Sequence, residues 1–124
     1  LNQKVLSRAD DLCRDEGYEL DDAELVVVAY GFTARAALRA VRLARAQGVK
    51  AGLLRLITIW PFCSRPLAEL AGRGASFLAP EMNLGQVAGL VRQAAQGRPV
   101  HELTQVNGRS IAPRAILQKI GEVL

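Results

Sequence analysis

The sequence is poor in aromatic residues, which make up 5% of its 124 residues, and it has only two cysteines and one histidine. Half of the residues are hydrophobic, so an aliphatic core must carry the fold, and this composition favours an α/β or all-α protein over a β-sandwich. Cys13 and Cys63 lie fifty residues apart without a CxxC or CxxH pattern, which indicates neither a disulfide framework nor a metal site. We therefore expect a reducing, cytoplasmic location.

Membrane spans and nucleotide-binding motifs are also lacking. The longest clear apolar run, Leu25 to Tyr30, is far shorter than the roughly 20 residues of a membrane span, and no signal-peptide pattern is present. Neither GxGxxG nor GxxxxGK[ST] occurs. The formal net charge is +4, but the arginines are spread along the chain, which predicts a solvated basic surface. We expect neither a membrane nor a nucleic acid as partner.

The length suits one domain, because a chain of this size buries roughly two-thirds of its unfolded surface. Apolar residues at positions 5, 6, 9, 12 and 13 follow the spacing of one helical face, which predicts an amphipathic helix that ends near Gly17. We assign residues 1–23 to this leading helix and a connector, and residues 24–124 to the domain. The sequence begins with Leu1 rather than methionine, so we expect it to have been cut from a longer polypeptide.

Strands and helices alternate in the first half of the domain. The continuous apolar run Leu25 to Tyr30 is typical of a parallel strand covered on both faces. Thr33 is a suitable N-cap for a helix from Ala34 to Gln47, and Val49 to Leu56 reads as the next strand. Such a strand–helix–strand unit predicts a parallel sheet. The expected helix has one stripe of arginines, which we expect to face solvent: Arg35, Arg39 and Arg42.

The second half continues the alternation. Ser76 to Ala79 reads as a third strand, and Asn83 with Gln86 forms a capping box for a helix that runs to Gln96. Val100 to Val106 reads as a fourth, edge-like strand. A last helix begins at Pro113, with Ala112 as an unfavourable N-cap that costs about 1 kcal/mol against Ser or Thr.

A candidate site lies where two turns are expected to meet. If the first and third strands are neighbours, giving the order 2-1-3-4, the turns at residues 31–33 and 81–86 share one crevice at the carboxyl ends of the strands. Two helix N-termini would then suit a small anion, or the two turns are simply tight connections. The candidate interface or anion-binding residues are Gly31, Thr33, Arg35, Arg55, Glu81, Asn83, Gly85 and Gln86.

Glu81 allows two interpretations. A carboxylate at the end of a buried strand is either an acid/base group with a shifted pKa or half of an ion pair, for which Arg55 is a suitable partner. No second catalytic group lies near it in the sequence, and we nominate no catalytic, cofactor-binding or metal-binding residue.

Three segments together carry a resemblance: AYGFTAR at residues 29–35, RLITIWPF at 55–62 and PEMNLGQ at 80–86. In this order and spacing they resemble the C-terminal, transketolase-C-like domain of the alpha subunit of 2-oxoacid:ferredoxin oxidoreductases, the 2-oxoglutarate enzymes above all. The resemblance covers residues 24 to 124. It implies a three-layer α/β/α sandwich around a mainly parallel sheet of four to five strands, in the order 2-1-3-4.

The resemblance also implies a function. Family members decarboxylate a 2-oxoacid oxidatively with coenzyme A and pass electrons through iron–sulfur clusters to ferredoxin, using thiamine diphosphate and Mg. The sequence has no GDG-type thiamine diphosphate motif and no cluster-binding cysteine array. We therefore expect a non-catalytic assembly domain that binds no cofactor itself. Its implied partners are the rest of the alpha subunit, the beta subunit and, through the complex, ferredoxin; a homodimer is a further option.

Two alternatives stay open at this point. The C-terminal domain of the beta subunit of 2-oxoacid dehydrogenase E1 components shares the fold, although its double glutamate and Gly-x-Gly are missing here. A stand-alone α/β module that binds a small anion at the two helix N-termini is the alternative from a different functional class.

Overall fold

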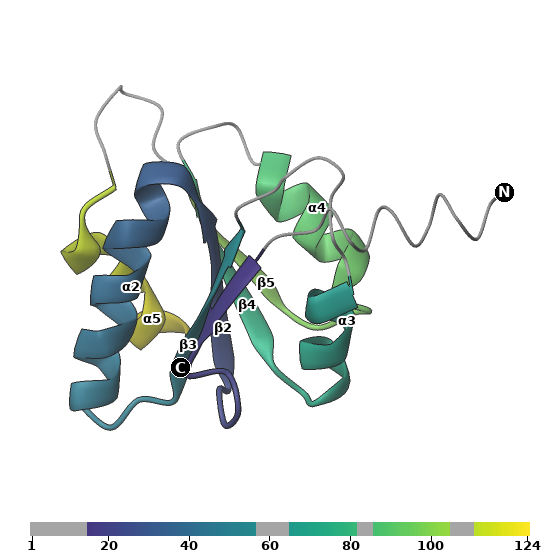
Figure 1. The fold of residues 1–124 in the computed structure, drawn as a ribbon, viewed down its shortest axis with the longest axis horizontal. Coiled ribbons are helices and arrows are strands. Elements are labelled where there is room, and N and C mark those ends of the chain that lie inside the picture. The colour runs from purple at the N-terminus through teal and green to yellow at the C-terminus, as the bar shows by residue number, and fades with distance from the viewer. Residues whose placement is uncertain (1–14, 57–64, 82–85, 105–110) are drawn as a thin grey trace, which may run out of the picture.

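The computed structural model describes residues 15–56, 65–81, 86–104 and 111–124 (Figure 1). A twisted sheet lies between two pairs of helices. Helices α2 (Gly31–Ala46) and α5 (Pro113–Val123) cover one face, and α3 (Arg65–Gly72) and α4 (Gln86–Ala94) cover the other (Figure 1). This arrangement is the three-layer α/β/α sandwich that the family resemblance implies. None of the described helices is long and apolar enough to cross a membrane.

The sheet has five strands in the order β1-β3-β2-β4-β5. The strands are β1 (Asp15–Tyr18), β2 (Leu25–Tyr30), β3 (Ala51–Leu56), β4 (Ser76–Glu81) and β5 (Val100–Thr104). All neighbouring pairs are parallel except β1 with β3. The four parallel strands confirm the predicted order 2-1-3-4, and β5 forms the predicted edge.

Strand β1 corrects the prediction of a helix that continues to Gly17. Residues 15–18 pair antiparallel with β3, with Glu16 opposite Arg55. Glu16 and Tyr18 share one face of the strand, where Tyr18 packs against the core, and this tertiary contact outweighs the helical pattern upstream. The apolar positions on which that pattern rests lie in residues 1–14, outside the described residues. The sheet thus includes residues that precede position 24, and the boundary between residues 23 and 24 stays a prediction.

The centre of the core is β2, because both of its faces are covered. Its residues Leu25 to Ala29 are fully buried. Val26 and Val28 belong to the cluster under α3 and α4, whereas Leu25, Val27 and Ala29 belong to the cluster under α2 and α5. Burial on both faces explains why this strand reads as a continuous apolar run without alternation.

The start of α2 differs from the prediction. The helix begins at Gly31 rather than Ala34, and its N-cap is Tyr30, without a side-chain capping bond. Gly31 has φ 61°, a conformation that glycine adopts readily, so the backbone turns directly at the end of β2. Thr33 is buried within the first turn, and its predicted role as N-cap is wrong.

Other boundaries shift by a few residues. Strand β4 continues through Pro80 to Glu81 instead of ending at Ala79. Strand β5 is described as Val100–Thr104, and its predicted end at Val106 lies outside the described residues. Helix α4 occupies Gln86–Ala94. The predicted cap at Asn83 lies outside the described residues.

Candidate functional site

The candidate site lies at the carboxyl ends of the neighbouring strands β2 and β4. Helix α2 leaves β2 towards one face, and α4 follows β4 on the opposite face (Figure 1). This is the topological switch point at which open parallel sheets bind ligands. Gly31 and Glu81 therefore lie at the ends of neighbouring strands, as predicted from the strand order.

The pairing between β2 and β4 stops short of this edge. Its register covers Leu25–Val27 and Ser76–Leu78 only, whereas β2 pairs with β3 along the whole strand. Pro80 supplies the reason. The amide of Ser76 donates to the Glu24 carbonyl on the β2 side, at 3.0 Å, and the amide of Phe77 donates towards β5.

Because backbone groups alternate along a strand, Pro80 occupies the β2 side, and proline has no N–H to donate. The ladder between the two central strands consequently loses its next hydrogen bond. The β2–β4 register therefore ends before the carboxyl ends of the two strands, where Tyr30 leads into α2 and β4 ends.

Three predicted residues lie in the first turns of α2, next to the end of β2. Gly31 is exposed, and a Cβ atom placed on it would meet no heavy atom of the described residues within 4 Å. Arg35 is exposed, while Thr33 is buried. The α2 N-terminus has no side-chain cap and no acidic residue in its first turn. A role in binding an anion stays a prediction.

The structure gives Arg55 a carboxylate other than that of Glu81. Arg55 Nη1 lies 3.8 Å from Glu16 Oε2 across the β1–β3 pair. The same Glu16 carboxylate accepts a hydrogen bond from the Tyr18 hydroxyl, which raises the pKa of Tyr18. Strand β2 separates β3 from β4, so Arg55 and Glu81 stand on strands that are not neighbours.

The remaining candidates are placed by their elements only. Glu81 is the last residue of β4 and Gln86 the first of α4, and their side chains lie outside the described part of the structure. Asn83 and Gly85 fall in residues 82–85, which the structure does not describe.

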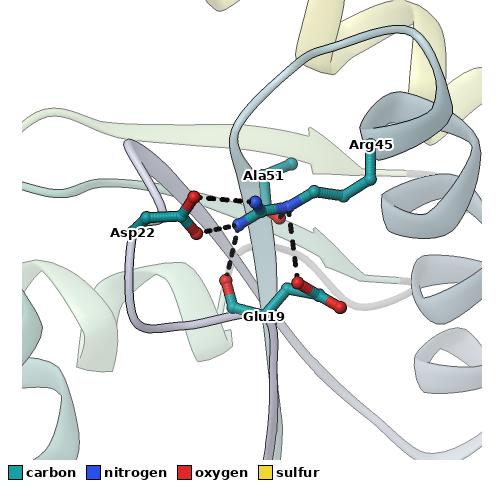
Figure 2. A network of polar contacts seen from close by, with 4 residues as sticks. All are labelled: Glu19, Asp22, Arg45 and Ala51. Carbon is teal, nitrogen blue, oxygen red and sulfur yellow. Dashed lines mark hydrogen bonds and ion pairs between the residues drawn. The ribbon is translucent and has the colours of Figure 1, made fainter.

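A polar network that the sequence does not predict lies at the amino ends of the parallel strands, at the opposite end of the sheet from the candidate site (Figure 2). The Arg45 guanidinium binds both carboxylate oxygens of Asp22, at 2.7 and 3.1 Å. It also donates to the backbone carbonyls of Glu19 and Ala51, at 2.8 and 2.7 Å. One side chain thus joins the last turn of α2 to the loop before β2 and to the start of β3.

The charges in this network stabilise each other. Hydrogen bonds from Arg45 lower the pKa of Asp22, and Asp22 raises the pKa of Arg45. One signal was available in the sequence: the segment 19–24, which contains four acidic residues, precedes a strand–helix–strand unit. Such a unit returns the end of its helix to the end of the sheet at which the first strand starts. The pairing partner still depends on tertiary structure.

The hollow beside Arg45 does not suit the phosphate-bearing cofactors that the resemblance implies for the whole enzyme. This hollow, of about 550 Å³, is lined by Glu19, Asp21 and Asp22, whose carboxylates repel the phosphates of coenzyme A or thiamine diphosphate. Arg45 itself is already engaged there. Within the described ranges, no three His, Cys, Asp or Glu side chains are grouped to hold a metal ion.

Comparison with protein families gives a match over most of the chain. Residues 23–116 match the family described as pyruvate:ferredoxin oxidoreductase core domain II. The chain is 42% identical over 123 residues to the ketoisovalerate oxidoreductase subunit VorB of Methanothermobacter thermautotrophicus, covering 99% of this chain and 35% of that subunit. It is 36% identical over 121 residues to the 2-oxoglutarate synthase subunit KorA of Methanothermobacter marburgensis, covering 97% and 32%. The chain therefore spans about a third of the length of these relatives.

Two solved structures share the fold at low sequence identity. One is a 2-oxoglutarate:ferredoxin oxidoreductase from Magnetococcus marinus, with a TM-score of 0.84 and 20% identity, covering 98% of this chain and 21% of that one. The other is a split-gene transketolase, an inactive tetramer, with a TM-score of 0.71 and 19% identity, covering 88% and 40%. They confirm the predicted transketolase-C-like sandwich. The family match over residues 23–116 shows that this chain belongs to the pyruvate:ferredoxin oxidoreductase core domain II family.

Proposed function

We propose that this chain is a non-catalytic assembly domain in the alpha subunit of a 2-oxoacid:ferredoxin oxidoreductase. The observation that carries the proposal is the match to core domain II over residues 23–116, in a chain that spans about a third of subunits such as VorB. The whole complex would decarboxylate a 2-oxoacid oxidatively to its acyl-coenzyme A and pass the electrons to ferredoxin. The relatives favour this proposal over a stand-alone anion-binding module or a dehydrogenase E1 domain.

The substrate is proposed at the level of a class. The relatives are named for ketoisovalerate and for 2-oxoglutarate, which share the 2-oxoacid group and differ in their side chains. We place the substrate pocket outside this chain, with 2-oxoglutarate as the first substrate to try.

We assign the cofactors and partners to the rest of the complex. Thiamine diphosphate, Mg, iron–sulfur clusters and coenzyme A would be bound elsewhere, in keeping with the acidic lining of the hollow beside Arg45. The partners would be the remainder of the alpha subunit, the beta subunit and ferredoxin, in the cytoplasm. The polypeptide detected in cells with an antibody against this chain should then be much heavier than 13.4 kDa.

The test uses the full-length subunit co-expressed with its partners. Changing Asn83 and Gln86 together to alanine should weaken assembly, because residues 81–86 would shape the surface between domains. Gel filtration of the purified complex measures the assembled fraction. The matched control is Gln47→Ala with Gln118→Ala, which removes two exposed amides elsewhere. Assembly as complete in the Asn83 and Gln86 variant as in this control would refute the proposal.

A further inference from the structure

The exposed face of α2 carries positive charge only. The helix contains four arginines and no acidic residue. Arg45 is engaged in the network at its end, whereas Arg35, Arg39 and Arg42 are exposed on the side opposite the buried core positions. Among the described residues, no hydrogen bond or ion pair to any of these three is found. We call these three residues and Leu43 the α2 arginine face.

Two other exposed arginines of the same protein, by contrast, have acidic partners. Arg65 lies 3.9 Å from Glu69, one helical turn away, and Arg92 lies 3.2 Å from Glu102 of the neighbouring strand. On α2, Arg39 follows Arg35 by four residues and precedes Arg42 by three. Like charges at these spacings repel along a helix. The α2 arginine face therefore opposes the stability of its own helix, and acidic groups from outside would relieve the repulsion.

Leu43 favours a protein as the source of those acidic groups, because it places an apolar side chain among the arginines. Its side chain is 40% exposed, and among the described residues only Leu124, at the end of the sequence, is also a large exposed hydrophobic residue. Leu43 follows Arg42 directly and Arg39 by one helical turn, so an apolar side chain lies within the basic stripe. Protein interfaces combine arginines with apolar anchors in this way. A membrane surface needs a broad apolar helix face, and that of α2 is buried against the sheet.

We propose that the α2 arginine face docks onto an acidic surface of the beta subunit. An apolar depression in that surface would receive Leu43. This inference rests on the proposed assembly function and names the surface through which assembly occurs. Carboxylates on the partner would pair with the three arginines, and they would steer association as well as fix its register.

The experiment is performed on the full-length subunit and its separately purified partner. Arg39→Glu with Arg42→Glu should raise the dissociation constant by about tenfold or more, because two attractive contacts become repulsive. Wild-type affinity should fall with added salt, and this dependence should be reduced in the variant. The matched control, Lys50→Glu with Arg73→Glu, makes the same charge change at two exposed positions outside α2 and should bind as wild type does.

Two further variants keep the test decisive. Arg39→Ala with Arg42→Ala retains good helix formers, so it should fold even where the glutamate pair does not, and it should bind several-fold more weakly than wild type. Leu43→Ala should weaken binding while preserving the salt dependence. Wild-type affinity in the arginine variants would overturn the inference.

The outcomes separate this inference from the proposed function. If the arginine variants assemble normally while the Asn83 and Gln86 variant does not, the assembly function stands and a different surface carries it. If none of these variants impairs assembly, both proposals fall. Loss of binding to anionic vesicles or to nucleic acid with unchanged assembly would reassign the α2 arginine face and overturn the inference.

Discussion

Among the residues at the amino ends of the parallel strands, Arg45 is the one whose loss should lower the stability of the fold most. Its side chain is 22% exposed and donates to two backbone carbonyls besides the Asp22 carboxylate. Arg45→Ala should lower the free energy of unfolding by about 1–2 kcal/mol, since charged donors to such groups contribute this much after allowance for partial exposure. Denaturant titration measures the change. Arg42→Ala, on the same helix without a described partner, should change it by less than about 0.5 kcal/mol.

Asp22 makes part of this stability depend on pH. Its folded-state pKa is lowered by Arg45, so the ionised carboxylate stabilises the fold above its unfolded pKa of about 3.9. That contribution is lost as the pH falls through the folded value. The melting temperature of the wild type should therefore fall more steeply below about pH 4 than that of Asp22→Asn. Parallel curves for the two proteins would show that the pair does not contribute.

Gly52 in β3 leaves no room for a side chain. A Cβ atom there would lie 2.8 Å from the Glu19 carbonyl oxygen and 3.0 Å from the Ala23 Cβ. Because backbone must move to admit it, Gly52→Ala should cost about 1–3 kcal/mol in unfolding free energy. Gly89→Ala is the contrasting change, since no described heavy atom lies within 4 Å of its Cβ, and it should add about 0.5–1 kcal/mol to the stability of α4. Equal melting temperatures for the two variants would contradict this.

For single residues, local periodicity determined which predictions from the sequence are correct. The exposure of Arg35, Arg39 and Arg42 was predicted because helical spacing alone places them opposite the buried alanines. Arg45 lies on the same helix, but its partners come from residues 19, 22 and 51. No short-range pattern encodes contacts between segments so far apart.

Among the elements, α5 offers the clearest route to greater stability. Its N-cap is Ala112, exposed and extended at φ −75° and ψ 148°, with no side-chain cap. This geometry suits a hydroxyl that accepts a hydrogen bond from the first turn. Ala112→Ser should therefore raise the unfolding free energy by about 1 kcal/mol, measured by denaturant titration. Ala112→Val offers no acceptor, and an equal gain in that variant would exclude capping as the cause.

The long elements were predictable and the short or unusual ones were not. Strand β2 and helix α2 have strong apolar patterns, and both appear within a few residues of their predicted bounds. Strand β1 has four residues and becomes a strand only by pairing with β3, far along the sequence. The early start of α2 depends on the backbone conformation of Gly31, which residue type allows but does not dictate.

For the whole molecule, the strand order alone predicts where the candidate site lies, without knowledge of the side-chain positions. Alternating strands and helices predict a parallel sheet, and right-handed crossovers with the family resemblance predict the order that brings Gly31 and Glu81 to neighbouring strands. The early end of the β2–β4 register was not predicted. It follows from which side of β4 lacks an amide, and only the pairing of β4 with both neighbours reveals that.

The central position of β2 has a consequence for protein synthesis. Its partners are β3 and β4, at residues 51–56 and 76–78, so on the ribosome the strand must wait for both. At about 5–20 residues per second, the stretch between Tyr30 and Leu78 takes roughly 2–10 s to make.

During that interval an uncharged segment, LVVVAY, has at least one flank unpaired. Such segments associate with one another readily. A nascent polypeptide interrupted before Ser76 should therefore become a chaperone substrate or an aggregate, whereas interruption after Leu78 leaves the centre of the sheet complete.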